Sequence, residues 1–335
     1  MILLSVSFFA SAILCGAGLY ILSSLLPSSF LAARFNSRSN HSVAARQIGG
    51  LALIPAIVLS LVLFGTHLGL DSRMMLCLSG ASLLLWIIGA LDDRFELSVK
   101  TRFAAQFIAA CLILYGLGAD FRLFPKLLPH SVEIIILVIA LIASINITNF
   151  MDGLDLMTVG GIGTPLLGVA ILAALTMTDA GSGAIAAITA GGLLGFAFFN
   201  RPPARIFLGD SGSLPIGLLA GTVFLLLAKN THIVVALILP LYYILDTSTT
   251  LILRAVKGEN IFKAHSQHAY QLARRSGWSV QKIIVHVVLL NLLLISGAMI
   301  IIRCEHIFVQ IAGLFIALVV VLLLLLDFRG LIRTL

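Results

Sequence analysis

Apolar runs recur along the whole chain, and short polar segments separate them. Each run has about 17–25 residues, which is enough to cross a bilayer as an α-helix. None alternates as a transmembrane strand would, and open sheets do not span lipid. The pattern predicts an all-α integral membrane protein, a bundle of about ten or eleven transmembrane helices. The expected spans are 3–26, 49–68, 74–91, 102–118, 133–149, 159–177, 183–199, 213–229, 232–253, 283–302 and 305–326.

Composition agrees with a membrane protein. The 335 residues are 60% hydrophobic and 10% charged, unlike a soluble domain. The first run has no positive segment before it and is too long for a signal peptide, so we expect a retained helix. No long polar linker interrupts the pattern, which indicates one transmembrane domain over 1–335. The four cysteines form no CxxC pair and predict neither a zinc site nor a disulfide framework.

The distribution of basic residues predicts the orientation. With the N-terminus outside, sixteen of the 21 Lys and Arg residues fall in inside segments, as the positive-inside rule expects. The C-terminus is then inside. The net charge of +7 reflects this bias and does not indicate nucleic-acid binding. The predicted inside loops are at about 27–48, 92–102, 150–158, 200–212 and 254–282.

The first candidate motif is Asp92-Asp93, at the inside end of the third run. Adjacent residues of a helix point about 100° apart, so the pair could serve two partners, such as a metal and a proton. Lys100 and Arg102 follow on the same loop and could meet phosphate charge. The alternative is a solvated helix end with an ordinary charge pair.

The second motif has a polar residue at every third position: Asn146, Asn149, Asp152 and Asp155. Gly153 allows the helix to unwind there. Asn146 lies deep enough to be a polar contact between two helices. That alternative does not explain two further carboxylates beside a glycine, so the motif favours a functional role.

The third motif runs from Asn200 to Ser213. Phe207 lies where the loop turns back towards the bilayer, and the glycines that follow allow close backbone approach. Free amides at a helix start favour anions. Asp210 adds a hard oxygen ligand, and Mg²⁺ binds through one or two carboxylates together with substrate phosphate. The alternative is an ordinary helix start capped by Asp210 or Ser211.

The last large loop contains His265 and His268 among basic residues. One helical turn would bring the two rings together. A diphosphate suits this loop better than zinc, for which further ligands are missing. A basic loop lying on lipid headgroups is the alternative. Asp246 lies inside the ninth run, where a carboxylate is a functional hypothesis by default. Arg46 precedes the second run and is a weaker candidate.

Together these motifs resemble the polyprenyl-phosphate N-acetylhexosamine-1-phosphate transferases, also called glycosyltransferase family 4. The resemblance covers about residues 36 to 275, with all motifs in the family's order. It implies a multi-pass enzyme of the bacterial inner membrane, with a periplasmic N-terminus and a cytoplasmic active site. Such enzymes transfer a sugar-1-phosphate from a UDP-N-acetylhexosamine to undecaprenyl phosphate and release UMP. A homodimer is left open.

The resemblance also implies roles for the candidate residues. Asp210, with Asp152, would hold Mg²⁺, or Mn²⁺ in its place. Asp92, Asp93 and Asp152 would be catalytic, with one aspartate of the pair acting as base or assisting the metal. The residues that would bind substrate are Lys100, Asn146, Asn149, Asp155, Asn200, Phe207, His265 and His268. Direct attack by the lipid phosphate and a two-step path through an aspartyl intermediate both fit these residues.

The chain departs from the family pattern at two places. The Pro-Thr-Pro-Arg run that often precedes Gly49-Gly50 is absent. The histidine loop lacks the three consecutive histidines of the peptidoglycan branch, which favours priming of O-antigen or another surface polysaccharide. The peptidoglycan branch and a multi-span secondary transporter are the alternatives. A transporter is disfavoured because its ionisable residues usually lie near the midplane. A non-catalytic scaffold leaves the motifs unexplained.

Overall fold

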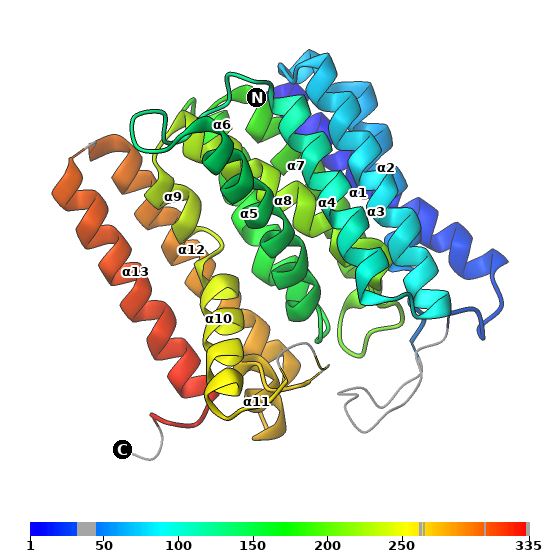
Figure 1. The fold of residues 1–335 in the computed structure, drawn as a ribbon. Helices are drawn as coiled ribbons and strands as arrows, with labels where there is room; N and C mark the ends of the chain where they lie inside the picture. Colours follow the sequence, from blue (N-terminus) through cyan, green and yellow to red (C-terminus); the bar gives the residue numbers. More distant parts are fainter. Residues whose placement is uncertain (32–44, 261–262, 264, 305, 333–335) are drawn as a thin grey trace.

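The computed structural model describes residues 1–31, 45–260, 263, 265–304 and 306–332. Over these residues the chain folds into helices, with one isolated bridge between Arg46 and Ile206 (Figure 1). The helices are α1 (Ile2–Leu25), α2 (Gly49–Phe64), η1 (Thr66–Leu68), α3 (Ser72–Phe95), α4 (Val99–Leu117), α5 (His130–Met151), η2 (Val159–Gly163), α6 (Thr164–Ala174), α7 (Ala180–Asn200), α8 (Asp210–Asn230), α9 (Ile233–Ile238), α10 (Leu241–Val256), α11 (Ala269–Arg275), α12 (Val280–Cys304) and α13 (Ile307–Phe328).

The all-α membrane fold predicted from the sequence is confirmed. Within the described residues, eight helices are long and apolar enough to cross a membrane, and Gly49–Phe64 and Val159–Ala174 are shorter apolar helices. Every expected span coincides with one of these helices or with the α9–α10 pair. The start of α1 and the end of α13 lie at opposite ends of the bundle, as an odd number of crossings requires (Figure 1). Which end faces the cytoplasm remains a prediction.

The centre of the bundle is formed by α7 and α8. Of the most apolar stretch of α8, 83% is buried, against 17% for α13 at the edge. α8 packs against α2, α3, α5 and α7, so its first residues are enclosed by other helices. Side chains at the start of α8 are therefore held in place by the surrounding helices.

The ninth span is not one helix, and the prediction of a continuous run over 232–253 was wrong. Pro240 separates α9 from α10 because proline has no N–H to continue the helical hydrogen bonds. α9 packs on α8, α12 and α13, whereas α10 packs on α5 and α13. The break thus moves the chain onto the helix that carries Asn146 and Asn149.

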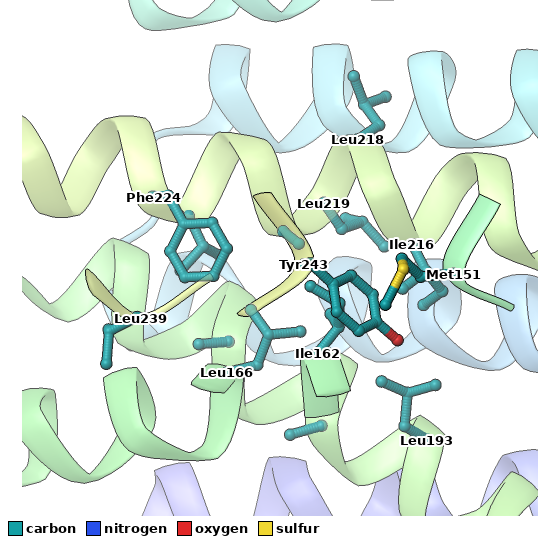
Figure 2. Packing of buried hydrophobic residues seen from close by; sticks show 14 of the residues in the cluster. Met151, Ile162, Leu166, Leu193, Ile216, Leu218, Leu219, Phe224, Leu239 and Tyr243 are labelled. Atoms are coloured by element: carbon teal, nitrogen blue, oxygen red, sulfur yellow. The ribbon is translucent and has the colours of Figure 1, made fainter. Parts of the chain in front are cut away.

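A π-helical turn, η2, begins the sixth span and receives a side chain of α10. A Cβ on Gly161 would lie 2.2 Å from the ring of Tyr243, so only glycine fits there. The Tyr243 hydroxyl donates to the Met157 carbonyl at 2.9 Å. Figure 2 shows the ring among Met151, Ile162 and Ile216. This contact fixes the loop after α5 against α10.

Candidate active site at the carboxylate end of the bundle

Asp92, Asp93, Asp152 and Asp210 lie at one end of the bundle, where α3 and α5 end and α8 begins. We call this the carboxylate end. The predicted inside loops meet here, apart from residues 32–44 of the first loop and residues 261, 262 and 264 of the last, which lie outside the described residues.

Asp93 caps α8 from a different helix. Its Oδ1 accepts from the Asp210 N–H at 2.9 Å, and its Oδ2 accepts from the Ser211 N–H at 3.1 Å. The residue before the helix is Gly209, with φ +70°, and it forms no side-chain cap. The alternative of an ordinary helix start capped by Asp210 or Ser211 is therefore wrong. Asp93 satisfies the free amides that were expected to favour an anion.

Glycines allow α2, α3 and α8 to meet at this point. A Cβ on Gly50 would lie 2.2 Å from the Gly212 nitrogen, and a Cβ on Gly89 would lie 2.3 Å from the Asp210 carbonyl oxygen. Any side chain at either position would push the start of α8 away. The backbone of the segment before α2 also pairs with the segment before α8, since Gly49 N–H donates to Phe207 O at 2.9 Å.

Arg102 lies between two of the carboxylates. Its guanidinium is 2.8 Å from Asp92 Oδ2 and 3.7 Å from Asp210 Oδ2. The other oxygen of Asp92 accepts from the Leu97 N–H at 2.6 Å. As the sequence indicated, Asp92 and Asp93 serve different partners. The sequence indicated that Arg102 could meet phosphate charge, and the structure places its guanidinium beside two carboxylates of the site.

Asn149 connects α5 to the start of α8. Its side-chain amide donates to Asp210 Oδ1 at 2.8 Å and to Ser213 Oγ at 2.9 Å. The Asp210 side chain is 27% exposed, so it is positioned by these contacts but still reachable from solvent. This is the arrangement expected of a carboxylate that is held for a ligand.

Asp152 follows directly after α5 and accepts a hydrogen bond from the Thr158 hydroxyl at 2.5 Å. Burial raises the pKa of Asp152 to about 7; the hydrogen bond from Thr158 lowers it, and the nearby charges of Asp93 and Asp155 raise it. A carboxyl with this pKa can hold or release a proton near neutral pH.

Asp155 and Asn200 hold two loops together. Asp155 Oδ2 accepts from the Ala204 N–H at 3.0 Å, and Asn200 Oδ1 accepts from the Leu156 N–H at 2.7 Å. The Asn200 amide also donates to the Ile206 carbonyl at 2.9 Å. Both side chains are buried and join the loop after α5 to the loop after α7.

Asn146 forms an amide pair with Gln106 of α4, at 2.7 Å. This is the contact between two helices that the sequence left open as an alternative. The same two side chains also line a pocket of about 450 Å³. Its wall is apolar on one part and basic or polar on another, and the lining is Val99, Arg102, Phe103, Gln106, Asn146, Asn149, Phe150, Leu214, Leu251, Lys263, His265 and His268.

The two histidines lie together, with ring centroids 5.0 Å apart, just before α11. Burial lowers the pKa of His265 to about 4, assisted by His268 and Arg254. Arg254 is buried and donates to the carbonyls of Asn260 and Lys263, at 2.8 and 3.1 Å. It thereby fixes the loop that carries the histidines.

Three candidate residues predicted from the sequence do not contact the four aspartates. Lys100 is exposed at the start of α4, and it forms no ion pair with another described residue. Phe207 is half-buried and contributes its backbone to the pairing with Arg46, at 2.8 Å. Arg46 itself donates to the Leu26 and Ser23 carbonyls at 3.0 and 3.3 Å, so it caps the end of α1.

Comparison with known proteins shows which family the chain resembles. Residues 75–229, which include Asp92, Asp93, Asp152 and Asp210, match the family described as "Glycosyl transferase family 4". Over these residues the chain resembles this family, and its relatives carry names of the same kind. The family resemblance stated from the sequence motifs is therefore confirmed.

Three relatives show the range of named proteins that the chain resembles. It is 26% identical to a "Probable undecaprenyl-phosphate N-acetylglucosaminyl 1-phosphate transferase" of Bacillus subtilis, over 73% of this chain and 70% of that protein. It is 28% identical to a "Decaprenyl-phosphate N-acetylglucosaminephosphotransferase" of Mycolicibacterium smegmatis, over 76% and 73%. A "Phospho-N-acetylmuramoyl-pentapeptide-transferase" of Deinococcus radiodurans is 29% identical, over 69% and 76%.

Proposed function

We propose that this protein transfers N-acetylhexosamine-1-phosphate from a UDP-sugar to undecaprenyl phosphate. In the reaction, an oxygen of the lipid phosphate bonds to the β-phosphorus of the UDP-sugar. The bond from that phosphorus to the oxygen bridging the α-phosphate breaks, and UMP leaves with the bridging oxygen. The lipid then carries a sugar diphosphate. The names of the relatives support this reaction.

The observation that supports the proposal is a cluster of carboxylates with few cationic partners. The cluster lies beside a pocket that is lined partly by basic and polar residues and partly by apolar residues. Four aspartates gather at the carboxylate end, and Arg102 is the one cation within 4 Å of any of them in the described part of the chain. The pocket next to them has basic and polar residues beside apolar ones. A polyprenyl phosphate has the matching division into charged head and apolar tail.

A divalent cation fits the carboxylate end, and we assign Mg²⁺ to Asp210 and Asp152. The described residues contain no group of three His, Cys, Asp or Glu that could hold an ion by itself. Mg²⁺ does not need one, because it commonly binds one or two carboxylates and completes its shell with phosphate and water. When bound it would neutralise diphosphate charge as the bond to UMP breaks.

The surroundings of the aspartates divide their roles. Asp93 accepts from two backbone amides and fixes the start of α8, and Asp92 is fixed by Leu97 and Arg102. These contacts favour Asp152 and Asp210 as the ligands of the cation, while Asp92 or Asp93 would act as base or assist the metal. Asn149, Lys263, His265 and His268 would hold the diphosphate.

The absence of three consecutive histidines in His265-Ser266-Gln267-His268 supports the O-antigen and surface-polysaccharide branch. The donor would then be UDP-GlcNAc or a 6-deoxy relative. Transfer with UDP-MurNAc-pentapeptide would place the chain in the peptidoglycan branch instead.

The test is UMP release by the purified protein, with undecaprenyl phosphate, Mg²⁺ and a panel of UDP-N-acetylhexosamines that includes UDP-MurNAc-pentapeptide. We expect release that needs both the lipid phosphate and the metal, and the responding donor assigns the branch. Asp120→Asn, at the opposite end of the bundle, is the matched control for aspartate variants. UDP-sugar uptake into proteoliposomes without UMP release would overturn the proposal.

A further inference from the structure

α13 ends beside the histidine loop, although its sequence belongs to none of the motifs discussed above. α13 packs on both α10 and α11. At its last residue the Phe328 ring packs edge-on against Trp278, with centroids 5.4 Å apart. Both side chains are buried. The next residue, Arg329, is thereby held at a fixed position rather than at a loose chain end.

Arg329 reaches a buried carboxylate. Its Nη2 donates to Thr250 Oγ1 at 2.8 Å and lies 4.0 Å from Asp246 Oδ1. Asp246 is 0% exposed. A buried carboxylate is costly unless charge and hydrogen bonds compensate it. Among the described residues, Arg329 supplies the one Lys or Arg nitrogen within 4 Å of Asp246.

Asp246 in turn holds the start of α11. Its Oδ1 accepts from the Ala269 N–H at 2.8 Å and lies 3.7 Å from His268 Nδ1. His268 is also tied to α11 through its own N–H, which donates to Gln271 Oε1 at 3.1 Å. The orientation of His268, which lines the 450 Å³ pocket, therefore depends on a carboxylate that Arg329 compensates.

We propose that Arg329 is a positioning residue of the active site, which acts through Asp246 to hold His268 and the start of α11 against the substrate pocket. The expected effect on UMP release rests on the proposed function, whereas the contact between Arg329 and Asp246 does not. The proposal gives the last transmembrane helix a role in the reaction, although Arg329 touches no pocket atom. It also gives the buried Asp246 side chain a basic partner, with Arg329 Nη2 4.0 Å from its Oδ1.

The test compares Arg329→Met with Arg303→Met in the purified full chain. Arg303 ends α12 at the opposite end of the bundle and is exposed, so it is a matched control. We expect Arg329→Met to lower kcat/KM for UMP release by roughly tenfold, because a small displacement of a positioning group costs this much or more. Arg329→Lys should restore part of the loss. Arg303→Met should leave kcat/KM unchanged.

A double-mutant cycle tests the path through Asp246. If Arg329 acts through Asp246, then Arg329→Met lowers kcat/KM less in an Asp246→Asn background than in the wild type. Equal losses in both backgrounds would overturn this path.

Hydrogen exchange of the amides of residues 265–275 gives a readout without turnover. We expect faster exchange there in Arg329→Met than in Arg303→Met, with equal exchange in α7. Unchanged exchange and unchanged kcat/KM would overturn the proposal. If the wild type releases no UMP with any donor, the proposed function fails, and the exchange result still decides whether Arg329 holds this segment.

Discussion

Acidic residues at the two ends of the bundle differ in their hydrogen-bond and ion-pair partners. Glu133, at the start of α5, accepts from the Arg122 guanidinium and from the Leu123 and Phe124 amides. Asp179, which caps α7, accepts from Ser182 N–H and Asn230 at 2.7 Å each. At the carboxylate end, Arg102 lies within 4 Å of Asp92 and Asp210, and no Lys or Arg of the described residues lies within 4 Å of Asp93 or Asp152. Glu133 and Asp179 have their oxygens occupied by donors that support the fold, whereas four carboxylates gather around one guanidinium at the carboxylate end.

Removal of one negative charge from the four aspartates of the carboxylate end should have the largest effect on activity. Asp210→Asn keeps the shape of the side chain but removes the charge that Asn149 and Arg102 position. We expect UMP release to fall at least ~100-fold, the size typical of a lost electrostatic contact in an active site. The unfolding temperature should not fall, because like charges are relieved. Full activity in Asp210→Asn would contradict a metal-binding role.

The packing that assembles the carboxylate end can be tested within one helix. A methyl group on Gly89 would meet the Asp210 carbonyl oxygen at 2.3 Å, whereas a methyl group on Gly80 meets nothing within 4 Å. We expect Gly89→Ala to lower UMP release about tenfold or more, since it displaces the start of α8. Gly80→Ala should leave activity unchanged and favour the helix slightly. Equal activity of the two variants would show that the close approach is not needed.

The opposite end should respond in stability rather than in activity. Glu133→Gln takes a charge away from Arg122 and leaves the amide NH₂ facing donors. Loss of one partner of a buried pair costs about 3–5 kcal/mol. We expect a clearly lower unfolding temperature in detergent, with UMP release per folded molecule close to that of the wild type. A loss of activity in the folded fraction of Glu133→Gln would contradict the view that this end supports stability and the carboxylate end supports activity.

The smallest expected effect concerns pH. Because the pKa of His265 is lowered to about 4, the ring is neutral across pH 5–8. His265→Gln should weaken UDP-sugar binding modestly, as a raised KM, and should leave the shape of the pH–rate profile unchanged. A profile that loses its acid limb in His265→Gln would show that the ring titrates in the working range.

The helices could be predicted from the sequence because the length of an apolar run and the basic residues in a loop can be read from a short segment of the chain. Asp92, Asp93, Asp152 and Asp210 were found because each follows or begins an apolar run. The break at Pro240 could have been predicted, because a proline within a span removes a helical hydrogen bond.

What could not be predicted depends on contacts between distant residues. Asp93 caps a helix that begins 117 residues later, so the sequence suggested a self-capped start instead. Asn146 meets Gln106 forty residues away. Arg329 was counted only as an inside charge, because nothing in the local pattern relates it to Asp246. Such pairs are set by how the helices cross, which hydrophobic periodicity does not encode.

The central claim is that the carboxylate end holds a divalent cation together with the diphosphate of a UDP-sugar. The most direct measurement is Mn²⁺ binding by electron paramagnetic resonance, with and without UDP-GlcNAc, in the wild type, Asp210→Asn and the Asp120→Asn control. The account predicts weak binding alone, tighter binding with the UDP-sugar, and loss of that gain in Asp210→Asn only. The same gain in Asp210→Asn as in the wild type would contradict the account.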